Sequence, residues 1–174
     1  MGGLSGPRGI KNLIAAVGRV EGACLWLLGD WSADTFKREC EAMPGYAKTT
    51  WHGKVRMDEV YRYLRAADLG ACVLQPLPNY VVSEPIKTWE YLACGLPLLL
   101  SDFPLWKAVF HQWSWYADPM DVAAIADAIT RSMTDPAERA TMARAGREAV
   151  ELTYAWEHER TRLIDLYRRL DQMK

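Results

Sequence analysis

The chain has 174 residues, of which 21 are Lys or Arg and 22 are Asp or Glu, so its formal net charge is -1. This length suits one globular domain whose core needs neither disulfides nor a structural metal. The balanced charge argues against a protein that binds nucleic acid through a basic surface. No apolar run approaches the roughly 18 residues of a membrane-spanning helix, and the glycine-rich start does not resemble a secretory signal.

Short apolar runs alternate with helical patterns along the chain, which favours an α/β fold with parallel strands. The continuous apolar runs are typical of strands that are buried on both faces. We expect strands at residues 23–28, 49–51, 69–75, 98–100 and 113–116. We expect helices at residues 8–19, 32–43, 57–67, 85–94, 121–133, 136–152 and 156–173.

The alternation begins with a helix, although a parallel α/β unit normally begins with a strand. Only residues 1–4 precede the first loop and helix, so the sequence resembles one that is cut near the end of its first strand. We therefore expect these residues to supply at most the end of that strand.

The four cysteines give no sign of a metal site or a disulfide framework. Cys24, Cys40, Cys72 and Cys94 form no C-x-x-C pair, and no histidine lies at metal-ligand spacing from any of them. Reduced thiols of this kind are typical of a cytoplasmic protein. We expect no metal and no cofactor, and a peripheral location at the inner face of a membrane remains open.

Residues 2–9 form a glycine-rich loop that leads into the first helix. Such loops let backbone amides approach a phosphate, and the end of the following helix favours an anion. The glycine spacing fits neither the dinucleotide-binding fingerprint nor the P-loop, and a flexible terminus would have the same composition.

Residues 83–97 contain a more informative pattern, because a helix opens there directly after an expected strand. Lys87 lies in the first turn, where a cation opposes the helix dipole unless an anion binds nearby. Glu90 lies one turn later on the same side and can accept hydrogen bonds from a vicinal diol such as a ribose. The alternative is an exposed Lys–Glu pair that contributes only a few tenths of a kcal/mol.

The ordered set of motifs resembles the C-terminal half of GT-B glycosyltransferases of the retaining family 4. The motifs are those at residues 2–9, 25–29, 51–55, 67–69, 85–97, 101–102 and 154–157. The resemblance implies that residues 1–174 form a Rossmann-like three-layer domain with a mostly parallel sheet. It also implies that this domain binds a nucleotide sugar, while a separate N-terminal domain, absent from this sequence, binds the acceptor.

The resemblance assigns the catalytic and diphosphate-binding roles to two cationic residues. Arg8 matches one of two cations in the family's first loop, and the other position falls on Gly3. Lys87 is expected to replace part of that missing charge. Pro85 and Ile86 open the helix whose amides would face the diphosphate.

The remaining substrate contacts are assigned in the same way. Glu90 matches the second member of a glutamate pair and is the expected ribose ligand. The first member falls on Val82, which cannot serve, and Glu84 lies two residues away. Gly53 and Val55 match a loop whose backbone meets the nucleobase.

We therefore expect the chain to be the donor-binding half of a retaining glycosyltransferase, an enzyme that transfers a sugar from a nucleoside diphosphate sugar to an acceptor. We expect this half to have no transferase activity by itself. The missing acceptor half could be a domain or a partner chain. Two alternatives stay open: a non-catalytic or vestigial nucleotide-binding domain of this fold, and an unrelated flavodoxin-like module. The sequence does not identify the sugar, base or acceptor.

In the family's strand order, 3-2-1-4-5-6, the first strand is central. If residues 1–4 are only its end, the neighbouring strands should each present an unpaired edge. We expect a short strand segment beside a gap or a loosened sheet, or a strand added by another chain.

Overall fold

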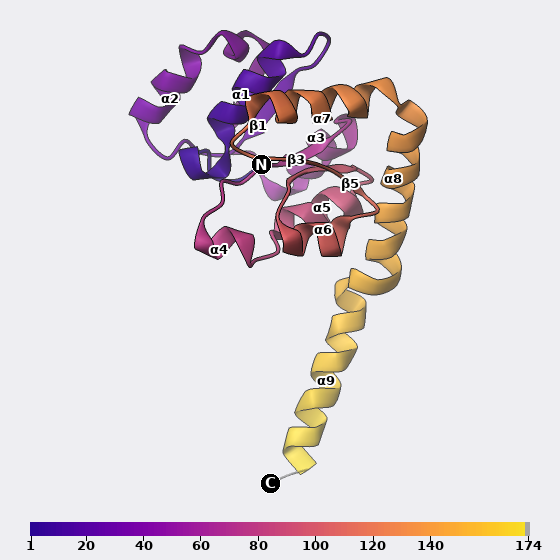
Figure 1. The fold of residues 1–174 in the computed structure, drawn as a ribbon. Coiled ribbons are helices and arrows are strands. Elements are labelled where there is room, and N and C mark those ends of the chain that lie inside the picture. The colour runs from indigo at the N-terminus through magenta and orange to yellow at the C-terminus, as the bar shows by residue number, and fades with distance from the viewer. Residues whose placement is uncertain (173–174) are drawn as a thin grey trace.

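The computed structural model describes residues 1–172 and shows an α/β fold in which every paired strand is parallel (Figure 1). The strands are β1 (Leu25–Leu28), β2 (Thr49–Gly53), β3 (Gly70–Cys72), β4 (Leu98–Ser101) and β5 (Ser114–Ala117). All five lie at the expected places, but their ends differ by a few residues. The expected strand at residues 69–75 is the most shortened, because only Gly70–Cys72 pair with β4.

Helices follow the strands at the expected places, and two short ones were not expected. The helices are α1 (Ile10–Arg19), α2 (Asp34–Glu41), α3 (Met57–Ala66), α4 (Pro78–Val81), α5 (Ile86–Ala93), α6 (Pro104–Phe110), α7 (Val122–Thr134), α8 (Pro136–Ala149) and α9 (Trp156–Gln172). The unexpected helices, α4 and α6, each begin with a proline, which is preorganised for a first helical turn. The expected end of the last helix at Met173 lies outside the described residues.

The core has two halves, one on each face of the strands. Leu98 and Leu100 of β4 point into one cluster, with residues of α3, α5 and α6. Leu99 points into the other cluster, with residues of α1 and α7. Because side chains alternate along a strand, a continuous apolar run fits a strand that is covered on both faces. The result is a three-layer arrangement, with α7 on one side of the strands and α5 and α6 on the other (Figure 1).

The sheet is split into a two-stranded part, β1–β2, and a three-stranded part, β3–β4–β5. Residues 1–9 lie between the two parts. The N–H of Gly2 donates to the carbonyl of Leu28 at 2.9 Å, and Leu4 forms a parallel bridge with Trp31. On the other side, the N–H of Gln75 donates to the carbonyl of Pro7 at 2.9 Å. If residues 1–4 are counted as the first strand, β1 to β5 are the second to sixth strands. Their order is then the expected 3-2-1-4-5-6, with a short extended segment and a gap at the central position.

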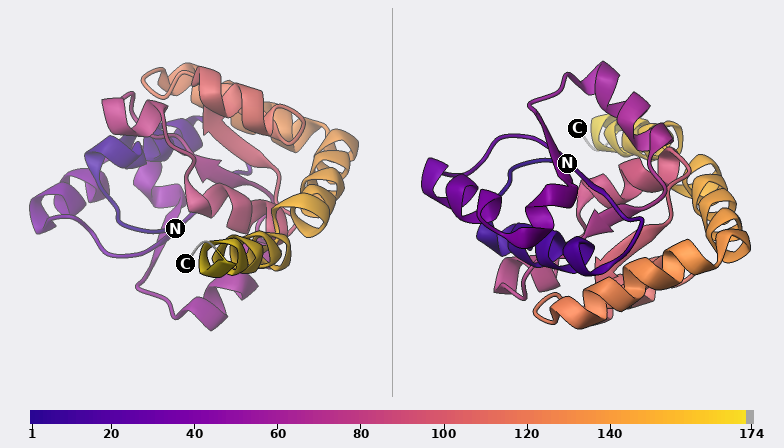
Figure 2. Two further views of the ribbon diagram at one scale, coloured as in Figure 1. Left: turned by 90° about the horizontal axis from the view of Figure 1, so that it is seen from below. Right: turned by 90° about the horizontal axis from the view of Figure 1, so that it is seen from above.

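The amino terminus consequently lies inside the outline of the domain rather than at its margin. In the views from below and from above, it lies close to the centre of the domain (Figure 2). Two glycines make room for this segment: a Cβ on Gly29 would collide with the carbonyl oxygen of Gly2, and one on Gly9 with that of Val73. Both also have a positive φ, of 134° and 71°, which favours glycine.

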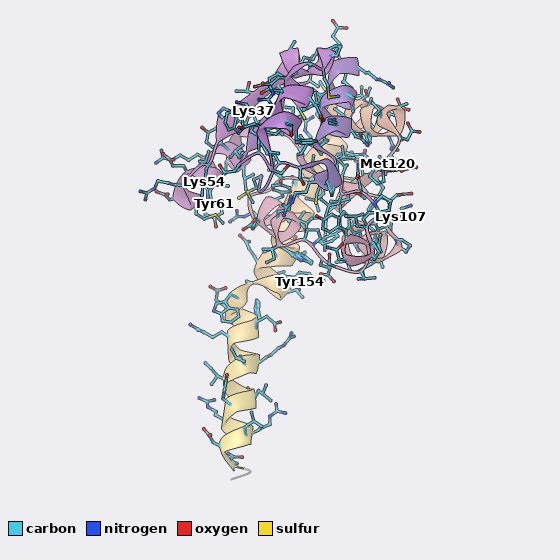
Figure 3. The ribbon with its side chains drawn as sticks, turned by 90° about the vertical axis from the view of Figure 1, so that its left-hand side faces the viewer. Lys37, Lys54, Tyr61, Lys107, Met120 and Tyr154 are labelled. Carbon is cyan, nitrogen blue, oxygen red and sulfur yellow. The ribbon has the colours of Figure 1, made fainter. Side chains whose placement is uncertain are left out.

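The C-terminal helices leave the domain in two steps. Gly146 of α8 packs against Leu92 and Trp113, and Arg147 donates to the carbonyl of Ala93 at 2.7 Å. After a π-helical turn, Val150–Tyr154, helix α9 projects away from the domain (Figure 1). Among its described residues none is buried, and most of the helix extends beyond the body of the domain (Figure 3). No helix within residues 1–172 is long and apolar enough to cross a membrane.

Candidate functional site

Two cationic side chains converge on the glycine-rich segment at the carboxyl ends of β1 and β3. A Cβ placed on Gly2 would lie 3.0 Å from Nη1 of Arg8 and 3.9 Å from Nζ of Lys87. Arg8 ends the short 3-10 turn Gly6–Arg8, whereas Lys87 comes from the first turn of α5. The fold therefore brings together the two residues that the sequence analysis placed on the diphosphate.

These two cations have no carboxylate partner among the described residues, because neither takes part in an ion pair there. Burial lowers the pKa of Lys87, and the charge of Arg8 lowers it further, while Cys72 and Glu90 act in the opposite direction. A partly buried lysine beside an arginine is unfavourable unless an anion balances the charge. The arrangement is therefore suited to bind an anionic group.

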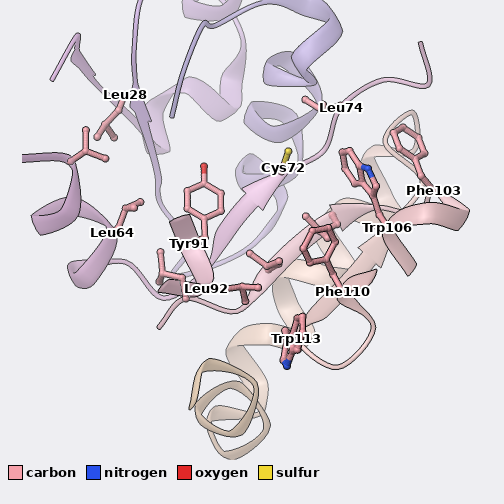
Figure 4. Packing of buried hydrophobic residues seen from close by; sticks show 14 residues of the cluster. Leu28, Leu64, Cys72, Leu74, Tyr91, Leu92, Phe103, Trp106, Phe110 and Trp113 are labelled. Carbon is pink, nitrogen blue, oxygen red and sulfur yellow. The ribbon is translucent and has the colours of Figure 1, made fainter. Parts of the chain in front are cut away.

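The amino group of Met1 is a third basic group at the same place. It donates to the hydroxyl of Tyr91 at 3.1 Å. Burial lowers the pKa of this amino group to about 5, with further lowering by Lys87 and Arg8. Tyr91 is buried and points its hydroxyl into the space between β1 and β3 (Figure 4). Tyr91 is not among the site residues predicted from the sequence, because an aromatic residue after Glu90 matches the pattern of core packing.

Helix α5 begins at Ile86 rather than at Pro85, which is a correction to the expected start. Both the N–H and the hydroxyl of Thr88 donate to the carbonyl of Pro85, at 3.0 and 2.6 Å. This makes Pro85 the residue before the first helical turn. The amides of Ile86 and Lys87 thus precede the first of these bonds, where helices commonly bind anions.

The two candidate glutamates occupy different surroundings. Glu90 is half-buried and lies on the turn after Lys87, close enough to influence the pKa of that lysine. Glu84 is exposed in the segment that precedes α5. The structure thus places Glu90, but not Glu84, within the electrostatic environment of the cations.

Gly3, Gly53 and Val55 are backbone candidates, and their surroundings differ. Gly3 is exposed, and a Cβ there would lie 3.9 Å from Nε of Arg8. Gly53 ends β2 with a φ of 72°, and its carbonyl accepts a bond from Gly29 at 2.7 Å. This bond links Gly53 to the edge where the glycine-rich segment lies. Val55 packs against the larger core cluster.

His52 lies beside this region, packed between two aromatic rings. Its ring centroid is 5.8 Å from that of Trp26 and 4.7 Å from that of Tyr63. Its Nε2 is buried and has no hydrogen-bond partner among the described residues. The half-buried position agrees with the packing role that the pattern of a histidine at a strand end most often indicates.

The buried amino group predicts a pH-dependent stability. Between pH 5 and 8 the unfolded chain binds this proton more strongly than the folded chain, so the free energy of unfolding should rise with pH in this window. We expect the chain with a free amino group to gain roughly 2–4 kcal/mol more between pH 5 and 8 than the same chain acetylated at Met1. Urea unfolding of both forms at both pH values measures this difference, and equal gains would contradict the burial of the amino group.

Comparison with known proteins agrees with this geometry. The glycosyl transferase-like family model matches residues 8–165. The fold is similar to that of sucrose-phosphate synthase from Thermosynechococcus elongatus, with a TM-score of 0.84 and 23% identity over 99% of this chain and 45% of that protein. Anabaena HepE, solved in complex with UDP, gives a TM-score of 0.79 and 17% identity over 97% of this chain and 48% of that one.

A third structure is nearly matched along its whole length. The catalytic domain of cholesterol-α-glucosyltransferase from Helicobacter pylori gives a TM-score of 0.71 and 20% identity over 89% of this chain and 96% of that domain. The chain thus spans less than half the length of the first two proteins and nearly all of the third. No curated protein sequence matches it significantly. The family model covers most of the chain, which therefore belongs to the glycosyl transferase-like family and has the Rossmann-like fold of a GT-B C-terminal domain.

Proposed function

We propose that this domain binds the nucleoside diphosphate sugar of a retaining glycosyltransferase. The observation that carries the proposal is the pair of cations without carboxylate partners, Arg8 and Lys87, beside the amides that open α5. A diphosphate carries the negative charge and the acceptor oxygens that this arrangement favours. The UDP found in Anabaena HepE supports a nucleotide of this class.

Each candidate residue has a role in this proposal. Arg8, Lys87 and the amide of Ile86 hold the diphosphate and stabilise the charge that develops on it as the sugar leaves. Glu90 accepts hydrogen bonds from the ribose hydroxyls. The backbone from Gly53 to Val55 lies against the base. No step in this scheme requires a metal, since cationic side chains and a helix end balance the charge.

The acceptor-binding site would come from a second domain or a partner chain. Sugar transfer requires the acceptor oxygen to be held against the anomeric carbon, and this positioning accounts for much of the rate enhancement of such reactions. The chain spans 45% of the sucrose-phosphate synthase that it resembles, which leaves room in that protein for a second domain. A non-catalytic nucleotide-binding domain is the second candidate, since fold alone does not establish activity.

Replacing either cation should weaken nucleotide binding. We expect Arg8→Ala and Lys87→Met each to lower the affinity for UDP, GDP or ADP by at least about tenfold, since a hydrogen bond to a charged group contributes roughly 1.5–3 kcal/mol. Calorimetric titration measures this affinity. Lys107→Met is the matched control, because Lys107 lies on α6 and pairs with Asp102 at 3.5 Å (Figure 3).

Lys87→Met should also change the stability of the free chain in the opposite sense. Because burial and Arg8 lower the pKa of Lys87, removing its charge should raise the melting temperature without nucleotide. The stabilisation by added nucleotide should decrease. If Arg8→Ala and Lys87→Met both bind nucleotide like the original chain, or if no nucleotide binds at millimolar concentration to folded protein, the diphosphate site is wrong.

The role of Glu90 can be tested with a modified ribose. We expect Glu90→Gln to weaken UDP binding by several-fold, and to weaken 2′-deoxy-UDP binding less, because the deoxy ligand lacks one hydroxyl that the carboxylate would accept from. Calorimetry with both ligands and both proteins gives this coupling directly. Glu59→Gln, on the exposed side of α3, is the control. Equal losses for the two ligands would remove Glu90 from the ribose site.

The proposal also predicts the activity of the isolated chain. We expect no sugar transfer from a nucleoside diphosphate sugar to an added acceptor, because this chain does not hold the acceptor. Slow donor hydrolysis is compatible with the proposal, since water needs no acceptor site. Chromatographic detection of a glycosylated acceptor, with no other protein present, would refute the two-domain mechanism.

A further inference from the structure

The segment that leads from α4 into α5 carries the backbone that opens the candidate diphosphate site, yet it packs little by itself. Val82, Ser83 and Glu84 are all exposed. The residue before the first turn of α5 is Pro85, whose side chain cannot cap the helix. An exposed, uncapped segment of this kind is expected to move readily unless another element of the fold holds it.

Helix α6 supplies this support through Trp106. The indole N–H of Trp106 donates to the carbonyl of Ser83 at 2.6 Å. The N–H and the hydroxyl of Ser83 bond only within the same turn, to the carbonyl of Tyr80. Within residues 1–172, the bond from Trp106 is therefore the one hydrogen bond that joins residues 82–85 to an element other than α4 and α5.

Trp106 is itself fixed from two sides. Its side chain is fully buried, and its ring centroid lies 4.8 Å from that of Phe103. Figure 4 shows these two rings side by side in the core cluster. The backbone carbonyl of Trp106 accepts a hydrogen bond from the hydroxyl of Tyr116 on β5 at 3.1 Å. The contacts thus connect β5, through α6, to the segment that precedes α5.

The choice of a tryptophan at this buried position has a consequence for the site. A buried indole N–H needs an acceptor, and here the acceptor lies in an exposed segment rather than in the core. The bond fixes a point three residues before Ile86, whose amide forms the candidate anion site together with Lys87. A small displacement of this turn would move both groups relative to Arg8, and such sites are sensitive to displacements of about 1 Å.

We propose that Trp106 is a positioning residue of the diphosphate site. Its indole N–H holds the carbonyl of Ser83, and this bond sets where the first turn of α5 places Lys87. Trp106 acts through residues 83–87 and does not touch the ligand. The effect on a ligand rests on the proposed function, whereas the order of the turn is a property of the free chain.

The test uses two replacements of tryptophan by phenylalanine. Trp106→Phe keeps an aromatic ring in the core but leaves the carbonyl of Ser83 without its donor. Trp113→Phe is the matched control, because Trp113 is buried in the same cluster and its indole nitrogen donates to no other described residue. Benzothienylalanine incorporated at position 106 is a second variant that serves even if Trp106→Phe does not fold, since a sulfur atom replaces the N–H in a ring of the same shape.

Hydrogen exchange of the free chain measures the order of this turn without a ligand. The amide of Thr88 donates to Pro85 at the start of α5, and that of Cys94 donates to Glu90 and Tyr91 at its end. We expect both variants at position 106 to speed exchange at Thr88 by about fivefold relative to Cys94, the factor that a lost hydrogen bond gives in a local equilibrium. Trp113→Phe should leave the ratio of the two exchange rates unchanged.

Nucleotide binding then measures whether the turn acts on the ligand. Calorimetric titration uses whichever of UDP, GDP and ADP the original chain binds most tightly. We expect Trp106→Phe to lower this affinity by about fivefold and Trp113→Phe to leave it unchanged. Trp106→Phe combined with Lys87→Met should lose clearly less affinity than the product of the two single losses, because Trp106 acts by placing Lys87.

Three results would overturn the proposal. The first is an unchanged ratio of exchange at Thr88 and Cys94 in the variants at position 106. The second is a pair of affinity losses, for Trp106→Phe and Lys87→Met, that multiply in the combined variant. The third is an equal loss of affinity in Trp113→Phe, because general weakening of the core would then explain the effect.

Failure of the proposed function would give a different result. If the original chain binds none of the three nucleotides at millimolar concentration, the diphosphate site is wrong. The exchange ratio in the free chain would still decide whether Trp106 fixes the first turn of α5, since that measurement needs no ligand.

Discussion

The backbone of residues 1–9 links the two parts of the split sheet, and the candidate site depends on this link. Gly2 bonds to Leu28 beside one part, and Pro7 accepts a bond from Gln75 beside the other. The same segment carries Arg8 to the carboxyl ends of the strands. Because Gly29 and Gly9 have no side chains, their neighbours can approach closely enough for these contacts. Where the segment lies therefore sets where the cations meet.

This placement makes the free site electrostatically unfavourable. Arg8, Lys87 and the amino group of Met1 lie close together, and burial lowers the pKa of both amines. A domain selected only for stability would place a carboxylate among them, and Glu90 only partly fulfils that role. An anionic ligand would offset the repulsion, so the same interactions that weaken the free domain favour the bound one.

The cores on the two faces of the strands are largely independent of this site. Leu98, Leu99 and Leu100 are fully buried on β4 and supply both clusters. Helix α8 packs on the domain through Gly146, whereas α9 contributes no buried residue to it. The three-stranded part β3–β4–β5 therefore has a complete core around its central strand, while β1 and β3 each have one edge on the gap between the two parts of the sheet. Within the sheet, local stability should be lowest at these two strands.

Much of the fold follows from local patterns in the sequence. Apolar runs such as residues 98–100 identify buried strands, and Gly95 with Pro97 separates one of them from the preceding helix. The order of the motifs predicts the family, and it selects Arg8, Lys87 and Glu90 as candidates before any contact is known. These patterns are readable because the periodicity and the turn residues reflect the neighbours along one chain.

Other features were decided only by tertiary structure. Three of them depend on residues far apart in the sequence. These are the convergence of Arg8 with Lys87, the contact of Tyr91 with the amino group of Met1, and the length over which β3 pairs with β4. The pKa of Lys87 is lowered by surroundings from several elements, which no local window contains. Desolvation and strand pairing depend on which distant segments pack together, so they appear only when the chain is folded.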